Sequence, residues 1–154
     1  MDKVLSAQVI AAIVIVLFLA LAAVWIFIRK QRKKTDAFED MEGHEFEFFC
    51  ADLLRDRGFV EVEVTRGSGD YGIDILVEKD GATYAIQSKR YGTPVGVKAI
   101  QEADAGRDYY DRMVGAVMTN QYFTSPAVEA AGKLKILLWD GGYLEEMMAE
   151  GRQK

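Results

Sequence analysis

The sequence predicts an α/β fold: a central mixed β-sheet flanked by helices and preceded by one N-terminal transmembrane helix. Three observations lead to this prediction. An unbroken apolar run opens the chain, helix-like and strand-like apolar patterns alternate after it, and an Asp-Gly pair joins two strand-like segments. Such alternation is typical of a sheet with helices on its faces. The 154 residues leave room for one domain of ordinary size and an appendage.

The apolar run extends from Val9 to Ile28 and is 20 residues long. A helix of that length spans about 30 Å, the thickness of the hydrocarbon core of a bilayer. We therefore expect Val4 to Ile28 to form a transmembrane helix in contact with lipid. A cleaved signal peptide is the first alternative, with Ala20-Leu21-Ala22 as a mimic of its cleavage site, but its apolar core would be shorter. A buried core helix is less favoured, because the rest of the chain is too small to surround it.

Positive charges gather on one side of this run. Asp2 and Lys3 precede it, whereas the segment RKQRKK, residues 29–34, follows it. Lys and Arg are retained on the cytoplasmic side, so we expect a single-pass membrane protein with its C-terminal domain in the cytoplasm. The basic cluster also suits anionic lipid headgroups, and DNA binding is its less favoured alternative. The predicted organisation is an anchor over residues 1–30, a basic juxtamembrane linker over 31–40, a folded domain over 41–150 and a tail over 151–154.

Charge and cysteine content restrict what the domain does. Residues 36–154 hold 13 Lys and Arg against 23 Asp and Glu, a formal charge of −10. A generic nucleic-acid binder is basic, so this balance weighs against a DNA function unless basic residues gather locally. Cys50 lies in an apolar helical pattern and is interpreted as a small buried residue. With one Cys and one His in the chain, a structural zinc site is excluded.

Apolar spacing predicts the elements of the domain in order. Apolar residues at helical spacing predict an amphipathic helix over about Glu39 to Arg57 that ends at Gly58. Strict alternation then predicts a strand over Phe59–Thr65. The expected elements after it are strands over Tyr71–Val77 and Ala82–Lys89, a helix over Val95–Arg112, a strand over Met113–Thr119, a helix from Pro126 to Lys133, a strand over Leu134–Trp139 and a helix over Tyr143–Glu150.

The pair Asp80-Gly81 is a strong signal for a two-residue hairpin turn. Such a turn pairs Val77 with Tyr84, Ile75 with Ile86, and Asp74 with Gln87. Because side chains alternate between the faces of a strand, one face of the hairpin is apolar and belongs in the core. That face consists of Ile73, Ile75, Val77, Tyr84 and Ile86. The other face brings Asp74, Gln87 and Lys89 within about 7 Å of one another.

A carboxylate, an amide oxygen and an ammonium group together suit phosphate chemistry at a hard cation. Mg²⁺ prefers oxygen ligands, which Asp74 and Gln87 would supply. The metal would lower the pKa of a bound water and neutralise charge on a phosphoryl group, and Lys89 would position that water or stabilise the transition state. Glu47, at the rim of the apolar face of the first helix, would add a carboxylate. The alternative is an ordinary solvated face of an antiparallel sheet.

Five segments in order extend this pattern along the domain: GHEFEFFCADLLRDRGF from Gly43, TRGSGDYGIDILV from Thr65, YAIQSKRY from Tyr84, VMTNQYFTSPAVEAA from Val117 and ILLWDGGYLEEMM from Ile136. Together they resemble the Mrr-like branch of the restriction-endonuclease-like nucleases, the PD-(D/E)xK superfamily. The resemblance implies that superfamily's fold, and Gln87 stands where the wider superfamily has an acid. It also implies an endonuclease that hydrolyses DNA phosphodiester bonds, in restriction of foreign or modified DNA.

The resemblance assigns roles residue by residue. It implies a catalytic set of Glu47, Asp74, Gln87 and Lys89, in which Asp74 and Gln87 hold Mg²⁺ or Mn²⁺, Lys89 is the catalytic ammonium and Glu47 is an auxiliary acid. Supporting positions are Asp70, Gly72, Thr119 and Asn120. A local basic rim would come from Arg66, Lys89, Arg90 and Lys98.

Other functions stay open on the sequence alone. The first is a non-catalytic, membrane-tethered module on the same fold that binds nucleic acid or protein; metal binding would separate it from the enzyme. The second is an assembly protein whose acidic surface is the functional face. A homodimer is a further expectation for the enzyme, because cutting both DNA strands commonly needs two active sites.

Overall fold

The computed structural model describes residues 14–25, 38, 41–65 and 71–151. The chain forms two compact units, residues 1–36 and 37–154. In the first unit, residues 14–25 are α-helical. Within the described ranges, no helix is both long enough and apolar enough to cross a membrane. Residues 4–13 and 26–28 of the expected span, and the basic segment after it, lie outside the described residues, so the anchor stays a prediction.

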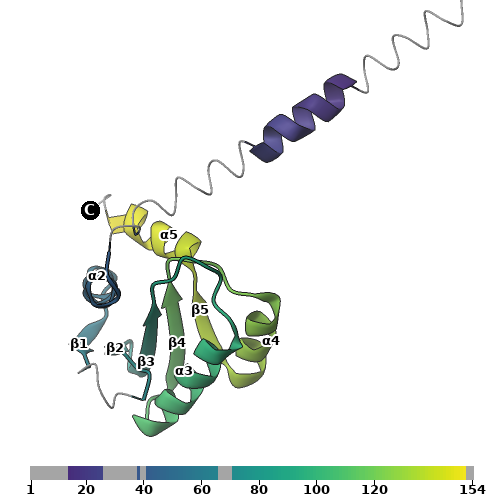
Figure 1. Ribbon diagram of the computed structural model, residues 1–154. Helices are drawn as coiled ribbons and strands as arrows, with labels where there is room; N and C mark the ends of the chain where they lie inside the picture. Colours follow the sequence, from purple (N-terminus) through teal and green to yellow (C-terminus); the bar gives the residue numbers. More distant parts are fainter. Residues whose placement is uncertain (1–13, 26–37, 39–40, 66–70, 152–154) are drawn as a thin grey trace, which may run out of the picture. The chain divides into compact units, whose positions relative to one another are not determined.

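The second unit is built on a five-stranded mixed sheet in the order β1-β2-β3-β4-β5 (Figure 1). Antiparallel pairing joins β1 to β2 and β2 to β3, whereas β3, β4 and β5 run parallel. The strands are β1 (Val60–Val64), β2 (Ile75–Lys79), β3 (Ala82–Lys89), β4 (Val114–Thr119) and β5 (Ile136–Trp139). The expected α/β class with a mixed central sheet is confirmed.

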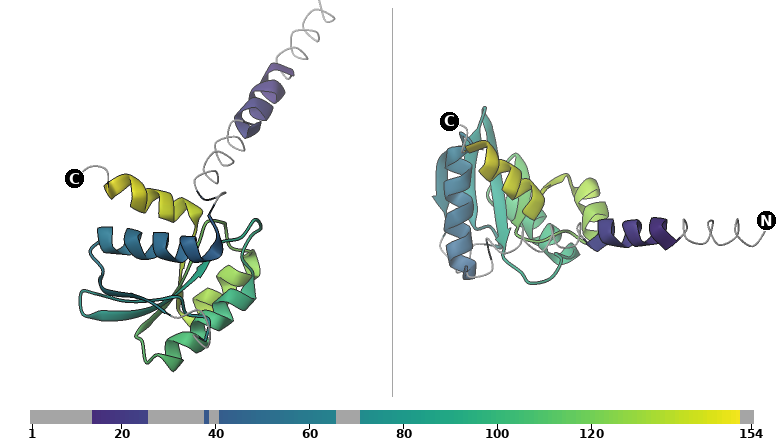
Figure 2. Two further views of the ribbon diagram at one scale, coloured as in Figure 1. Left: turned by 60° about the vertical axis from the view of Figure 1, so that its left-hand side comes forward. Right: turned by 90° about the horizontal axis from the view of Figure 1, so that it is seen from above.

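Helices cover both faces of this sheet. They are α2 (Gly43–Asp56), α3 (Val97–Tyr109), α4 (Ser125–Leu134) and α5 (Gly141–Gly151). One core cluster joins α2 and α5 to the sheet, with Phe46 and Leu144 among its fully buried members, and these two helices lie side by side (Figure 2). A second cluster joins α3 and α4 to the other face through Ile100 and Val117. Cys50 is fully buried in the first cluster, as expected.

Local signals explain where the helices begin and end. A capping box between Glu42 and Glu45 begins α2, and Gly58 follows its end at φ 79°. The side chain of Thr124 accepts a hydrogen bond from the amide of Ala127 and caps α4. Left-handed Lys135 then ends α4 at φ 57°. These boundaries agree with the sequence expectations to within a few residues.

The β2–β3 hairpin has the expected turn and register. Asp80 and Gly81 both have left-handed backbones, with φ of 52° and 80°, as a type I′ turn requires. Val77 pairs with Tyr84 and Ile75 with Ile86. The apolar face formed by these residues packs into the core beneath α2.

The entry to β2 differs from the expectation. The ladder begins at Ile75 rather than at Asp74 opposite Gln87, and the amide of Asp74 donates to the carbonyl of Ile86 at 2.9 Å. Ile73 packs with Leu76 on the face opposite Ile75, so its placement on the Ile75 face was wrong. The reason is local: Tyr71 and Gly72 have φ of 50° and 78°, so the chain enters the sheet from a turn and strict alternation fails.

The outer strand β1 is irregular. Its register with β2 shifts between Val60 and Glu63, and Glu61 within this shift has φ 49°. A residue in a left-handed conformation at this point is typical of a β-bulge. The strand is therefore kinked, although the sequence alternation predicted a regular one.

Replacing Phe46 with Ala is expected to destabilise the domain strongly. Phe46 is fully buried and packs edge-on against Phe38, with ring centroids 5.8 Å apart. Removing such a side chain costs about 3–5 kcal/mol, measurable as a lower urea midpoint by circular dichroism. Phe48→Ala on the same helix is the control: Phe48 is 49% exposed, so the expected change is below about 0.5 kcal/mol. Equal losses in both variants would contradict this assignment of the core.

Candidate active site

Gln87 and Lys89, near the end of β3, both lie on the face covered by α3. The amide Nε2 of Gln87 donates to Oε2 of Glu102 on α3 at 2.9 Å. The ammonium of Lys89 lies 3.3 Å from the same oxygen. One carboxylate from α3 therefore holds both predicted site residues of this strand. The two side chains point the same way because they are two residues apart.

The oxygen of the Gln87 amide has no hydrogen-bond partner among the described residues. Gln87 is fully buried, and its Oε1 is one of the few buried polar atoms left unsatisfied. The amide orientation is set by chemistry, because a carboxylate only accepts and so requires Nε2 on the side of Glu102. An orphaned buried oxygen is costly without a partner, and a hard cation is a suitable one.

Asp74 reaches the same part of β3. Its Oδ2 accepts a hydrogen bond from the amide of Ser88 at 2.6 Å. Ser88 stands between Gln87 and Lys89, so the carboxylate lies beside the strand at their level. The structure thus places the Asp74 carboxylate beside β3 between Gln87 and Lys89, where its hydrogen bond from the Ser88 amide, rather than the predicted hairpin pairing, holds it.

Glu47 lies on α2 and forms an ion pair with Nδ1 of His44 at 2.8 Å. Burial is the main cause that raises the pKa of the Cys50 thiol, and the charges of Asp74 and Glu47 raise it further. The two carboxylates are therefore near the same buried thiol. Glu47 belongs to the helix on the other face of the sheet from α3, which Gln87 and Lys89 contact, and its auxiliary role remains a prediction.

The supporting positions have structural roles around the site. A Cβ on Gly72 would lie 3.0 Å from Nε2 of Gln87 and 3.3 Å from Cβ of Glu102, so a side chain there would press on that pair. The side chain of Asn120 bonds both the amide and the carbonyl of Tyr91, each at 2.9 Å, and holds the segment after Lys89. Thr119 is fully buried and accepts from the amide of Gln121. Asp70 lies outside the described residues.

Glu102 is a site residue that the sequence analysis did not identify. Besides Gln87 and Lys89 it contacts Lys98, 3.4 Å away and one helical turn earlier. Burial raises the pKa of Glu102, but the hydrogen bond from Gln87 and the two lysines outweigh it and hold that pKa below its usual value. The only available signal was a Glu on the helix after β3, which does not say which way the side chain points.

The donor set fits a hard cation that keeps several waters. Within the described ranges, no group of three His, Cys, Asp or Glu side chains forms a metal centre. The candidate ligands are instead one carboxylate, from Asp74, and one amide oxygen, from Gln87. Mg²⁺ is commonly bound by one or two carboxylates together with waters and substrate phosphates, so two protein ligands suffice.

The mixed sheet, the acid before β2 and the Gln-x-Lys sequence on β3 define a restriction-endonuclease-like nuclease domain. The chain belongs to the Mrr_cat restriction endonuclease family, whose model matches residues 38–148. Nucleases of this superfamily typically use a divalent metal. No curated protein matches the sequence.

Solved structures show the same fold. AF1548, a protein of unknown function, is 27% identical with a TM-score of 0.54 over 63% of this chain and 57% of its own. The DNA modification-dependent restriction endonuclease AspBHI is 17% identical, with a TM-score of 0.60 over 77% of this chain and 33% of its own. The MspJI restriction endonuclease in complex with a 27-mer oligonucleotide is 18% identical, with a TM-score of 0.54 over 77% and 30%. The chain spans only part of each of these proteins.

Proposed function

We propose that this protein is a divalent-metal-dependent endonuclease that hydrolyses DNA phosphodiester bonds. The observation that supports this most directly is the unsatisfied Oε1 of buried Gln87, beside the carboxylate of Asp74 and the ammonium of Lys89. Asp74 and Gln87 would hold Mg²⁺ or Mn²⁺. The bound metal would supply Lewis-acid stabilisation of the phosphate and a water of lowered pKa.

The residues of the chain itself would orient the reacting groups and stabilise the developing charge. Lys89, with its side chain only 23% exposed, would donate to a non-bridging phosphate oxygen or to the attacking water as negative charge develops. Asp74 is oriented by the Ser88 amide, so its carboxylate is held before any ligand arrives. Gly72 lets the backbone pass close to the Gln87–Glu102 pair without a side chain that would press on it. Glu47 would act as an auxiliary acid from α2.

The biological setting is part of the proposal. AspBHI is a modification-dependent restriction endonuclease, and restriction of foreign or modified DNA is the corresponding function proposed here. The anchoring of the domain through residues 4–28, on the cytoplasmic side, rests on the apolar run and the positive charges after it. A homodimer on DNA would bring two active sites to the two strands.

The test is cleavage by the full-length chain, kept in solution with mild detergent. Supercoiled plasmid, methylated and unmethylated, is incubated with Mg²⁺, Mn²⁺ or a chelator, and nicked and linear products are separated on a gel. We expect products with either metal and none with chelator. Binding of plasmid without cleavage in any of these conditions would contradict the enzyme and favour the non-catalytic module.

A further inference from the structure

We propose that Glu102 is a positioning residue that turns the amide oxygen of Gln87 toward the metal and holds Lys89 beside it. This inference rests on the proposed function, because it assumes the metal site at Asp74 and Gln87. Its basis is the shared contact: Oε2 of Glu102 accepts from Gln87 Nε2 at 2.9 Å and lies 3.3 Å from Lys89 Nζ.

The chemistry of a carboxylate makes this contact selective. An amide can present either its oxygen or its NH₂ group to a partner that both donates and accepts. A carboxylate only accepts, so Glu102 allows one orientation of the Gln87 amide. In that orientation Nε2 faces Glu102 and Oε1 is left for a cation. Gln in place of an acid on β3 therefore depends on a second residue to present its oxygen, which a symmetric carboxylate would not need.

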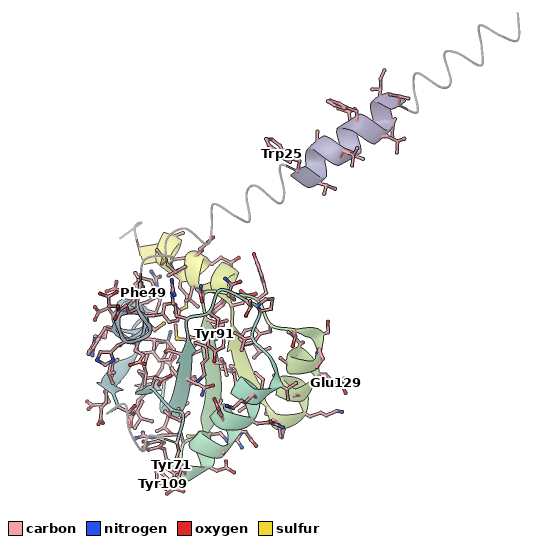
Figure 3. All side chains as sticks on the ribbon, viewed as in Figure 1. Trp25, Phe49, Tyr71, Tyr91, Tyr109 and Glu129 are labelled. Carbon is pink, nitrogen blue, oxygen red and sulfur yellow. The ribbon has the colours of Figure 1, made fainter. Side chains whose placement is uncertain are left out.

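The helix that bears Glu102 is fixed against the site. A Cβ on Gly106 would overlap Cγ1 of Ile73 and lie 3.0 Å from the carbonyl oxygen of Tyr71, so α3 touches the segment that leads to Asp74. Tyr71 also stacks on Tyr109 of α3 with ring centroids 3.7 Å apart (Figure 3). Close packing therefore fixes the distance between the backbone of α3, which bears Glu102, and the site.

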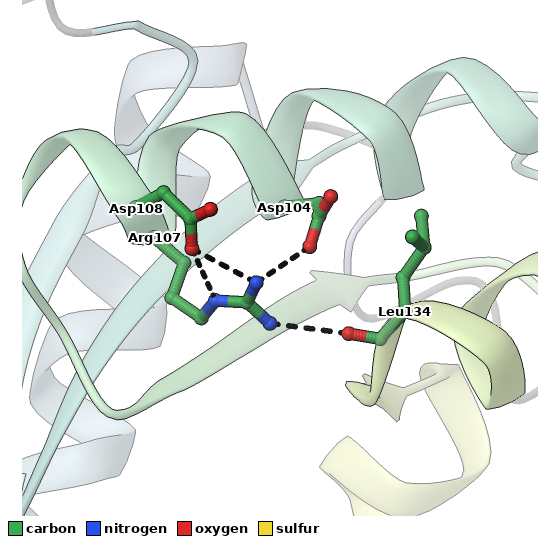
Figure 4. A network of polar contacts seen from close by, with 4 residues as sticks. All are labelled: Asp104, Arg107, Asp108 and Leu134. Atoms are coloured by element: carbon green, nitrogen blue, oxygen red, sulfur yellow. Dashed lines mark hydrogen bonds and ion pairs between the residues drawn. The ribbon is translucent and has the colours of Figure 1, made fainter.

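The far end of α3 is held separately by Arg107. Its guanidinium bonds Asp104, Asp108 and the carbonyl of Leu134 at 2.7, 2.9 and 3.1 Å (Figure 4). This network does not include Glu102, so it supplies a control. Asp108→Asn removes one negative charge from the same helix, as Glu102→Gln does, and its side chain is 71% exposed.

The experiment is Mn²⁺ titration of the metal-free, full-length protein by calorimetry, in mild detergent and without DNA. Wild type, Asp74→Asn, Asp108→Asn, Glu102→Gln, Gln87→Ala and the Glu102→Gln/Gln87→Ala double variant are compared, with folding checked by circular dichroism. We expect Glu102→Gln to bind Mn²⁺ about 10- to 100-fold more weakly than Asp108→Asn, the usual loss for a residue that orients a ligand. In the Gln87→Ala background the same change should add nothing, because its effect passes through Gln87.

Two results would overturn the inference while leaving the proposed function intact. The first is equal Mn²⁺ affinity in Glu102→Gln and Asp108→Asn. The second is a Glu102→Gln change that weakens Mn²⁺ binding as much in the Gln87→Ala background as in wild type, because Glu102 would then act independently of Gln87. Failure of the proposed function looks different. In that case wild type binds no Mn²⁺, or Asp74→Asn binds it as wild type does. Glu102→Ala, measured in parallel, covers the case in which Glu102→Gln fails to fold, and the same criteria apply to it.

Discussion

Lys89→Ala is expected to reduce Mg²⁺-dependent plasmid nicking at least about 10²- to 10³-fold, the usual cost of removing one group that stabilises developing charge. The ammonium is mostly shielded from water and 3.3 Å from Glu102, so it is already held in place beside the proposed metal site. Lys89 is the single basic residue of β3. The measurement is the initial rate of plasmid nicking at saturating metal.

The matched control is Lys98→Ala. Lys98 contacts the same carboxylate, at 3.4 Å from its other oxygen, but its side chain is 89% exposed. Both variants lose one positive charge and one partner of Glu102. A loss in rate of the same size in both would mean that charge near the site, rather than the position of Lys89, explains the effect.

Asp74→Asn is expected to abolish both Mn²⁺ binding and cleavage while the domain stays folded. The Asn oxygen can still accept from the amide of Ser88, as Asp74 does at 2.6 Å, so the local backbone contact survives. The negative charge that a hard cation requires is lost. We expect a loss of Mn²⁺ affinity beyond the detection limit of calorimetry, and plasmid nicking at the level of the chelator control.

Asp140→Asn tests whether the effect belongs to this position. Asp140 also accepts a backbone hydrogen bond, from Tyr143 at 2.9 Å, but it follows β5, two strands from β3 in the sheet. Wild-type Mn²⁺ affinity is expected for this variant. Retained metal binding in Asp74→Asn would remove the carboxylate from the proposed metal site.

Sequence patterns predicted most of the fold because its determinants are local. Asp80-Gly81 fixes its own turn geometry, and the register of β2 with β3 follows from that turn alone. The same logic placed Gln87 and Lys89 on one face, since they share a strand. Helix boundaries also followed from local signals: Gly58 predicted the end of α2 and Pro126 the start of α4.

The missed features have one local cause and one cause that depends on a contact between distant parts of the chain. The left-handed conformations of Tyr71 and Gly72 broke the alternation before β2, and no residue preference predicts such a conformation for Tyr. The direction of Glu102 depends on how α3 is rotated over β3. That rotation is set by packing of Gly106 against Ile73, a contact that periodicity along the chain does not reveal.

The kink in β1 bears on how two copies of this domain could associate. An open edge strand is a template for pairing with the edge of another molecule, and bulges and charged residues are the usual protection against aggregation by this route. The β1 edge has both, in its irregular register and in Glu61 and Glu63. Self-association by extension of the sheet is therefore disfavoured at β1. A pair of nucleases working on two DNA strands would have to meet through another surface.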